Sequence, residues 1–214
     1  MYVPTHYSEH RTQELYDYIR LNSLGILLNI SFSGIEVSFV PFLLDVGKGA
    51  KGTLMGHIAR ANEHWQKLRD TPEATVIFLG PNVYISPSWL QNPEAVPTWN
   101  YVSVLVRGNF RLLDNEECLK ESILKMVERF EEAQCHPWST GHLKDEYFQG
   151  RLKHIVGFEI EITSIEGKRK LSQNRSEADR KSIISALMSK RDSNSEAIAK
   201  LMLDDLIRLK EPVL

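Results

Sequence analysis

The run GILLNISFSGIEVSFVPFLLDV, residues 25–46, constrains the fold of this chain more than any other segment. β-Branched and aromatic residues dominate it, and such residues favour extended backbone. Ser33 and Gly34 stand between its two apolar halves, where a hairpin needs residues that tolerate turn geometry. The run therefore predicts two long antiparallel strands joined by a tight turn.

Other segments extend this picture to a mainly β chain with helices. Helices are expected from a cap at Ser8 to about Asn22, over residues 61–70, and after a cap at Asn115. Further strands are expected at residues 53–58, 74–79, 82–86, 98–113 and 154–165. Because strands and helices do not alternate as in a parallel sheet, the pattern predicts an α+β fold with a closed or partly closed antiparallel barrel.

The character of the chain changes after Leu171. The motif SEAD, residues 176–179, has the spacing of a capping box and predicts a helix to about Arg191. A second amphipathic helix follows, so the two form a helical hairpin. We therefore expect a barrel domain over residues 1–171 and a C-terminal helical extension over residues 172–214 that packs on the barrel.

The charge balance argues against a generally cationic protein. The net charge is -2 and the pI is about 6.4, so the molecule as a whole does not attract DNA or anionic lipid. One cationic stretch, residues 166–191, holds eight basic residues against three acidic ones. A stretch this short is more often a solvated face or a phosphate clamp. DNA binding has weak support, because the second helix of the hairpin is acidic and no helix-turn-helix is evident.

Several features point to a cytoplasmic protein. The N-terminus is polar, and no later stretch approaches the length of an apolar membrane span. Cys118 and Cys135 lack metal-ligand spacing and are expected to be free thiols in a reducing compartment. His57 and His64 lack a third ligand at the usual spacing, so no metal site is expected.

The segment GHIARANEHW, residues 56–65, lies where a strand is expected to give way to a helix. The first N–H groups of a helix are unpaired and attract anions. Arg60 would add a planar guanidinium suited to a phosphate. The alternative is that Arg60 forms a surface ion pair while His57, His64 and Trp65 pack; these residues alone leave both interpretations open.

Three more clusters combine polar and aromatic residues at strand ends: YISPSW (residues 84–89), VPTWNY (residues 96–101) and KLSQNR (residues 170–175). They could converge on a flat, phosphorylated heteroaromatic ligand, where rings stack, amides read the heterocycle and cations hold the phosphate. The alternative is that the rings bury area and the amides form a turn. Composition does not decide between these interpretations.

Together with PFLLD after residue 40 and EGKRKLSQNRS after residue 165, these motifs resemble the PaiB family of FMN-binding split-barrel proteins, over nearly the whole chain. The resemblance implies a six-stranded Greek-key split barrel, a homodimer with FMN at the subunit interface, and a role as a negative transcriptional regulator. By position it gives His57, Arg60 and Asn62 the role of holding the FMN phosphate, and the strand-end clusters described above complete the set of expected cofactor-binding residues. These are His57, Ile58, Arg60, Asn62, Ser86, Trp99, Asn100, Lys170, Gln173 and Arg175.

Two other functions stay open from the sequence. One is a flavin-dependent oxidoreductase of the pyridoxamine-phosphate oxidase type, in which the flavin carries the hydride chemistry and the protein positions it. No residue identifies itself as a catalytic base, so no catalytic residue is assigned. The other is a haem-handling split barrel, which the histidine content permits.

Overall fold

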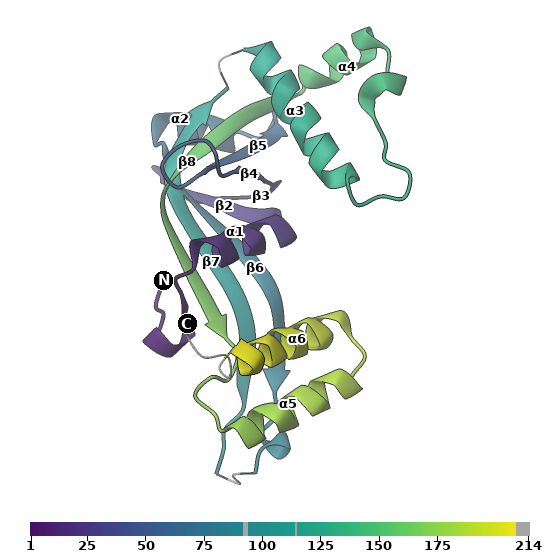
Figure 1. Ribbon diagram of the computed structural model, residues 1–214. Helices are drawn as coiled ribbons and strands as arrows, with labels where there is room; N and C mark the ends of the chain where they lie inside the picture. Colours follow the sequence, from purple (N-terminus) through teal and green to yellow (C-terminus); the bar gives the residue numbers. More distant parts are fainter. Residues whose placement is uncertain (92–93, 114, 209–214) are drawn as a thin grey trace. The chain divides into compact units, whose positions relative to one another are not determined.

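The computed structural model describes residues 1–91, 94–113 and 115–208. It is an α+β fold with an eight-stranded antiparallel sheet, in the order β3-β2-β6-β7-β8-β5-β4 with β1 paired to β8, and six α-helices in the described part (Figure 1). The strands are β1 (Ser8–Glu9), β2 (Leu24–Ser31), β3 (Gly34–Pro41), β4 (Leu43–Asp45), β5 (Thr53–Ala59), β6 (Glu73–Ile85), β7 (Thr98–Leu112) and β8 (Ile155–Lys170). The helices are α1 (Thr12–Leu21), α2 (His64–Asp70), α3 (Glu116–Glu131), α4 (Asp145–Leu152), α5 (Glu177–Ser189) and α6 (Ser193–Arg208).

The chain folds into two compact units. One comprises residues 16–78 and 105–165, and we call it the barrel unit. The other comprises residues 1–15, 79–104 and 166–214, and we call it the helical unit. Strands β6, β7 and β8 contribute residues to both units. The division into residues 1–171 and 172–214 that the sequence suggested stays a prediction.

The barrel unit has a core made by its strands. The predicted hairpin forms, with β2 and β3 paired from Leu24 with Pro41 to Ser31 with Gly34. Phe42 packs edge-on against Phe78 and Phe158, with ring centroids 5.8 and 6.1 Å apart. All three rings are at most 1% exposed. Burial of aromatic rings of this size is a dominant source of folding free energy, so this cluster stabilises the barrel.

The helical unit contains the predicted helical hairpin. The Ser176 side chain accepts a hydrogen bond from the backbone N–H of Asp179 at 3.1 Å, which confirms the cap at the start of α5. Ile183, Leu187 and Met202 are fully buried between α5 and α6, which lie side by side at the yellow end of the chain (Figure 1). None of the described helices is long and apolar enough to cross a membrane.

The structure corrects two predictions for the N-terminal half. Ser8 does not cap a helix; it lies in β1 and pairs with Lys168 of β8, and α1 begins at Thr12. The predicted break at Gly80 and Pro81 is absent, because β6 runs unbroken from Glu73 to Ile85. Extended backbone is compatible with the φ that a proline ring fixes, so Pro81 need not end a strand.

Two further differences lie in the second half. The last strand continues to Lys170, five residues beyond the predicted end at residue 165. α4, which the sequence did not predict, has apolar residues too scattered to form a stripe. By contrast, the cap at Asn115 is confirmed, since its side chain accepts a hydrogen bond from the N–H of Cys118 at 2.9 Å.

Candidate functional site

The residues that the sequence nominated fall into two groups, one in each compact unit. His57, Ile58, Arg60 and Asn62 lie at the end of β5 and in the turn after it, in the barrel unit. The others, Ser86, Trp99, Asn100, Lys170, Gln173 and Arg175, belong to the helical unit.

Arg60 is fastened to the backbone of its own unit. Its Nε donates to the carbonyl of Lys153 at 2.8 Å, and its Nη2 donates to the carbonyl of Ile155 at 3.0 Å. The Arg60 carbonyl accepts a hydrogen bond from Trp65 Nε1 at 3.1 Å. The two bonds from the guanidinium to the carbonyls of Lys153 and Ile155 join the turn after β5 to the start of β8. Only Nη1 of the guanidinium makes no hydrogen bond within the described residues, and Arg60 lines a cavity of about 240 Å³.

Asn62 belongs to a chain of internal hydrogen bonds. Its Nδ2 donates to Ser38 Oγ at 3.0 Å, and its Oδ1 accepts from the backbone N–H of His64 at 3.1 Å. His64, only 3% exposed, bonds through Nδ1 to Ser38 Oγ at 2.8 Å and through Nε2 to Asn29 Oδ1 at 3.1 Å. Burial lowers the pKa of His64. The side chains of Asn62 and His64 therefore form hydrogen bonds within the barrel unit and stabilise its interior.

The anion site expected at a helix start stays a prediction, because several N–H groups at the start of α2 are already bonded within the chain. α2 is only seven residues long, and Arg60 lies in a turn four residues before it. The N–H of His64 is already bonded to Asn62. Ile58 is buried, at 6% exposed. His57 Nδ1 is buried without a hydrogen-bond partner, and burial lowers the pKa of His57.

In the helical unit, Asn100 and Gln173 are also committed to internal contacts. Asn100 is fully buried; its Oδ1 accepts from Ser172 Oγ at 3.0 Å and its Nδ2 donates to Met202 Sδ at 3.4 Å. Gln173 accepts from the N–H of Leu171 at 2.8 Å and donates to the carbonyl of Arg169 at 2.8 Å. These amides hold the segment after β8 in place.

Ser86 has a local structural role. Its hydroxyl accepts from the N–H of Ser88 at 3.2 Å and so caps a 3₁₀ turn, Pro87–Trp89. Trp99, by contrast, is 52% exposed and meets Tyr84 edge-on, with ring centroids 6.3 Å apart. An exposed indole beside a second ring is a surface on which a flat ligand can stack.

Three cations of the helical unit gather among tyrosine rings. Lys168 Nζ lies 5.2 Å from the centre of the Tyr101 ring and 5.9 Å from that of Tyr2. Lys170 Nζ donates to Thr98 Oγ1 at 2.5 Å. Burial lowers the pKa of Lys170, and the charge of Lys168 lowers it further, while Tyr101 acts in the opposite direction.

Arg175 is included with Lys168 and Lys170 because its charge, like that of Lys168, acts on the Tyr7 hydroxyl. Burial raises the pKa of the Tyr7 hydroxyl, and the charges of Arg175 and Lys168 act to lower it. Tyr7 donates to Asn174 Oδ1 at 3.0 Å. Within the described residues, none of Lys168, Lys170 and Arg175 has a carboxylate oxygen within 4.0 Å. We call these three residues the cation group.

Arg169, which lies between two members of the cation group, has the opposite environment. It is 4% exposed, and its guanidinium nitrogens lie 2.5 Å from Asp205, 3.6 Å from Glu9 and 3.7 Å from Glu14. Burial raises the pKa of Asp205, and Arg169 acts to lower it. The positive charge of Arg169 is therefore balanced by carboxylates of the same unit, so Arg169 offers no uncompensated charge to a ligand.

Sequence reasoning assigned Lys170, Arg175 and Trp99 to the cofactor site and placed Tyr84 and Tyr101 in the polar-aromatic clusters, but it did not assign Lys168 to the site. The signal that could have found Lys168 is the two-residue period of a strand, which puts Lys168 and Lys170 on one face and Arg169 on the other. The prediction ended the strand at residue 165, so this alternation was not applied.

The basic stretch of α5 differs from expectation. Arg180 was expected on an exposed helix, but it is 2% exposed, and its Nη2 donates to the carbonyl of Met202 at 3.4 Å. Lys181 pairs with Glu177 at 2.8 Å, and Lys190 Nζ lies 5.0 Å from the centre of the Trp89 ring. Among residues 1–91, 94–113 and 115–208, no group of three or more His, Cys, Asp or Glu side chains is arranged to hold a metal ion.

Comparisons with known proteins agree with this architecture. The family model described as "Putative FMN-binding domain" matches residues 1–164. The protein "Protease synthase and sporulation protein PAI 2" of Bacillus subtilis is 32% identical over 206 residues, which cover 96% of this chain and 98% of that protein.

Two solved structures share the fold at low sequence identity. The flavocytochrome Anf3 from Azotobacter vinelandii has a TM-score of 0.58 and 11% identity, covering 76% of this chain and 68% of that one. The FAD and haem binding protein from Mycobacterium smegmatis has a TM-score of 0.55 and 13% identity, covering 76% and 73%. The likeness confirms the predicted split-barrel fold, with six long strands (β2, β3, β5, β6, β7 and β8) and the short β1 and β4 added.

Proposed function

Because the chain belongs to the PaiB family, whose shared domain is described as a "Putative FMN-binding domain", we propose that it is a flavin-binding protein whose ligand is FMN. The observation that carries this proposal is the cation group, Lys168, Lys170 and Arg175. These residues present positive charge without a carboxylate partner in the described part of the chain, beside aromatic side chains of the same unit.

A phosphate suits this environment for a physical reason. Lysine and arginine form charge-assisted hydrogen bonds to phosphate, and such bonds are about twice as strong as neutral ones. Since burial lowers the pKa of Lys170, a dianion nearby would stabilise its charged form. Trp99 offers an exposed ring face for the isoalloxazine. The roles of His57, Ile58, Arg60 and Asn62 in the same ligand remain proposals.

A titration of the purified protein with FMN tests flavin binding. Flavin fluorescence is quenched, and its absorption bands shift, when the ring stacks on an indole. We expect saturable quenching by the wild-type chain and weaker quenching by Trp99→Ala. If neither FMN nor FAD shows a change at protein concentrations of roughly 100 μM, where a micromolar site would be filled, flavin binding is wrong.

We also propose a homodimer, and the outer face of the β2–β3 hairpin supports it. Every cross-strand pair on this face is apolar: Leu24 with Pro41, Ile26 with Phe39, Leu28 with Val37, and Ile30 with Ile35. Phe39, Ile35 and Ile30 are 69%, 69% and 77% exposed. A contiguous apolar face of this kind is typical of an interface between subunits, and a two-fold axis would bury it against itself.

Light scattering tests the dimer. We expect the wild-type mass to be twice the 24.6 kDa of one chain, and Phe39→Lys to give the single-chain mass. Leu21→Lys is the matched control, because Leu21 is 79% exposed on α1, outside the hairpin. A wild-type monomer at micromolar concentration would refute the proposal. A dimer that persists in Phe39→Lys would show that the interface does not lie on the outer face of the hairpin.

The finer role that we propose is negative transcriptional regulation, with flavin as ligand or redox sensor. The Bacillus subtilis relative is named a protease synthase and sporulation protein, and this supports a regulatory role by analogy only. Direct DNA contact through α5 has little support, because Arg180 is buried and Lys181 is paired. An oxidoreductase of the pyridoxamine-phosphate oxidase type is the alternative.

A salt titration of duplex binding tests this view of α5. Each phosphate contact contributes a slope of about -0.9 in log K against log salt. We expect the triple variant Lys181→Ala, Lys190→Ala, Arg191→Ala to show the same slope as the wild type. A slope that flattens by two or more contacts in that variant would establish α5 as a DNA-binding surface.

A further inference from the structure

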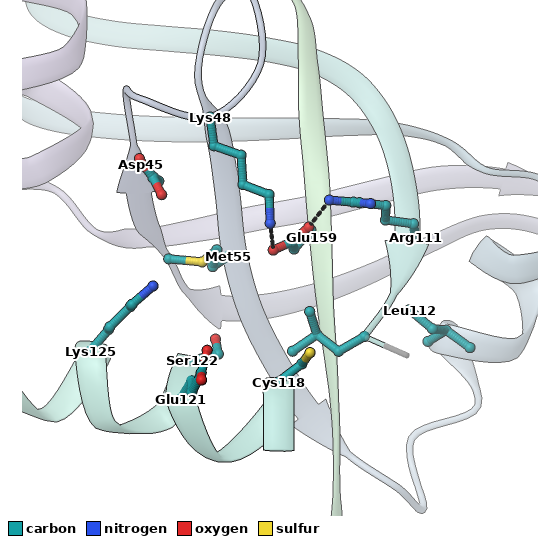
Figure 2. Close-up of a pocket in the computed structure, with 11 residues that line it drawn as sticks. Asp45, Lys48, Met55, Arg111, Leu112, Cys118, Glu121, Ser122, Lys125 and Glu159 are labelled. Atoms are coloured by element: carbon teal, nitrogen blue, oxygen red, sulfur yellow. Dashed lines mark hydrogen bonds and ion pairs between the residues drawn. The ribbon is translucent and has the colours of Figure 1, made fainter. Parts of the chain in front are cut away.

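A second cavity, of about 180 Å³, lies in the barrel unit, and none of the residues nominated for the flavin lines it (Figure 2). One wall is α3, and the others come from β5, β7, β8 and the loop after β4. Ligand pockets for drug-sized molecules span about 300–1,000 Å³, so this cavity suits a ligand with few heavy atoms.

Glu159 of β8 lines the cavity, and Figure 2 shows it between Lys48 and Arg111. It is 3% exposed, and its two carboxylate oxygens accept from Lys48 Nζ at 2.5 Å and from Arg111 Nη2. Its single negative charge is therefore shared by two cations. Lys48 and Arg111 are half exposed and keep further N–H donors for a ligand.

Two side chains of α3 face the cavity without partners in the described residues. Ser122 is 5% exposed, and its hydroxyl makes no hydrogen bond. Lys125, one turn further along the same face, extends from α3 toward the strands and has no ion pair (Figure 2). Since the Ser122 hydroxyl oxygen is not itself fully buried, it is open to the cavity, where it can donate a hydrogen bond to a ligand or accept one from it.

The charges that line the cavity balance. Lys48, Arg111 and Lys125 carry positive charge, and Asp45, Glu121 and Glu159 carry negative charge. A ligand with a net charge of either sign would meet like charges as well as opposite ones, and the like charges reduce its affinity. A small zwitterion meets opposite charges at both of its ends. Met55, Leu112 and Leu113 supply an apolar part of the lining.

We propose that this cavity binds a free α-amino acid with an apolar side chain. The carboxylate would lie against Lys125 and the Ser122 hydroxyl, the ammonium would face Asp45 or Glu121, and the side chain would contact Met55. This binding is independent of the flavin, because no member of the cation group lines the cavity.

Calorimetric titration of the full chain tests the proposal with L-leucine, L-methionine and the other common amino acids, each up to roughly 10 mM so that even millimolar affinities are seen. Two probes remove one end of leucine: 4-methylpentanoate lacks the ammonium, and 3-methylbutylamine lacks the carboxylate. We expect saturable binding of an apolar amino acid and at least roughly tenfold weaker binding of each half-ligand. Half-ligands that bind as well as the amino acid, or no binding by any amino acid, would overturn it.

Variants on α3 locate the binding. Ser122→Ala and Lys125→Met should each weaken amino-acid binding by roughly tenfold, while FMN binding is unchanged. Lys120→Met is the matched control, since Lys120 is on α3 but does not line the cavity. Full affinity in both Ser122→Ala and Lys125→Met, or an equal loss in the control, would place the amino acid elsewhere and overturn the proposal.

Discussion

Two segments of the chain have similar composition but differ in how their polar side chains are bonded. They are residues 57–64 and residues 168–175. Both contain amides and cations at the end of a strand. In the first, Arg60, Asn62 and His64 are hydrogen bonded to their own unit. In the second, only Arg169 is paired with carboxylates, while the cation group is not.

Residue type alone therefore does not reveal whether a polar side chain is available to a ligand. Availability depends on what the distant chain supplies. Arg60 donates hydrogen bonds to the carbonyls of residues 153 and 155. Arg169 forms ion pairs with carboxylates of α6 and the N-terminal segment.

The largest effect is expected from Arg169→Met. Removing this guanidinium takes from the partly buried Asp205 its ion-pair partner at 2.5 Å, and from the buried Glu9 one of two cations, since Glu9 keeps Arg11. Breaking a buried pair from one side costs up to about 3–5 kcal/mol. Urea unfolding measures the loss. Lys168→Met is the matched control, because Lys168, next to Arg169 in sequence, has no carboxylate partner in the described residues. Its loss should cost under about 1 kcal/mol.

Equal losses in these two variants would abolish the distinction between Arg169 and the cation group. A stabilised Arg169→Met variant would mean that the buried carboxylates are protonated or solvated in solution.

The pH dependence of stability tests the structural role of the first segment. Burial lowers the pKa of His57 and His64, so between their folded pKa values and the unfolded value of about 6.5 the unfolded chain binds more protons. The free energy of unfolding should therefore fall as pH decreases below about 6.5. Urea unfolding from about pH 8 to about pH 5.5 measures this fall.

His64→Gln is the matched variant for this experiment. It should cost about 1–3 kcal/mol at pH 8, because Asn29 or Ser38 loses a partner, and it should reduce the fall at lower pH. A wild-type stability that stays flat or rises over this pH range would contradict the neutral, buried state of these histidines.

A smaller effect is expected from Arg60→Ala. The side chain is exposed, but it holds two carbonyls at the start of β8, so its loss should cost about 1–2 kcal/mol. Arg69→Ala is a suitable control, because in the described residues Arg69 holds no carbonyl; it pairs with the exposed Asp70 and lies over the Trp65 ring, 5.9 Å from its centre. Indistinguishable unfolding curves for the two variants would show that the carbonyl contacts contribute nothing in solution.

Much of the fold could be predicted from the sequence because the signals are local. The apolar run at residues 25–46 gives the β2–β3 hairpin, and Ser176 and Asn115 cap the helices expected of them. Even so, the turn lies at Phe32 and Ser33, and Gly34, with φ of 117°, begins β3. The role of Ser8 was wrong because β1 exists only through its pairing with β8, far along the chain.

The site could be predicted only in part, for a related reason. The motif at residues 170–175 pointed to Lys170 and Arg175, and these side chains have no carboxylate partner in the described part of the chain. The sequence could not indicate that Asn100 faces Met202 or that Gln173 folds back onto Arg169, because these partners are set by the packing of the helical unit.

The phosphate preference of flavin binding shows whether the cation group holds the phosphate of FMN. We would measure the dissociation constants of FMN and riboflavin for the wild type, for Lys170→Met with Arg175→Met, and for Arg60→Ala. The account predicts that the wild type prefers FMN and that the double variant loses this preference by roughly ten- to a hundredfold, as the loss of charge-assisted contacts implies. A preference that survives in the double variant and disappears in Arg60→Ala would contradict it.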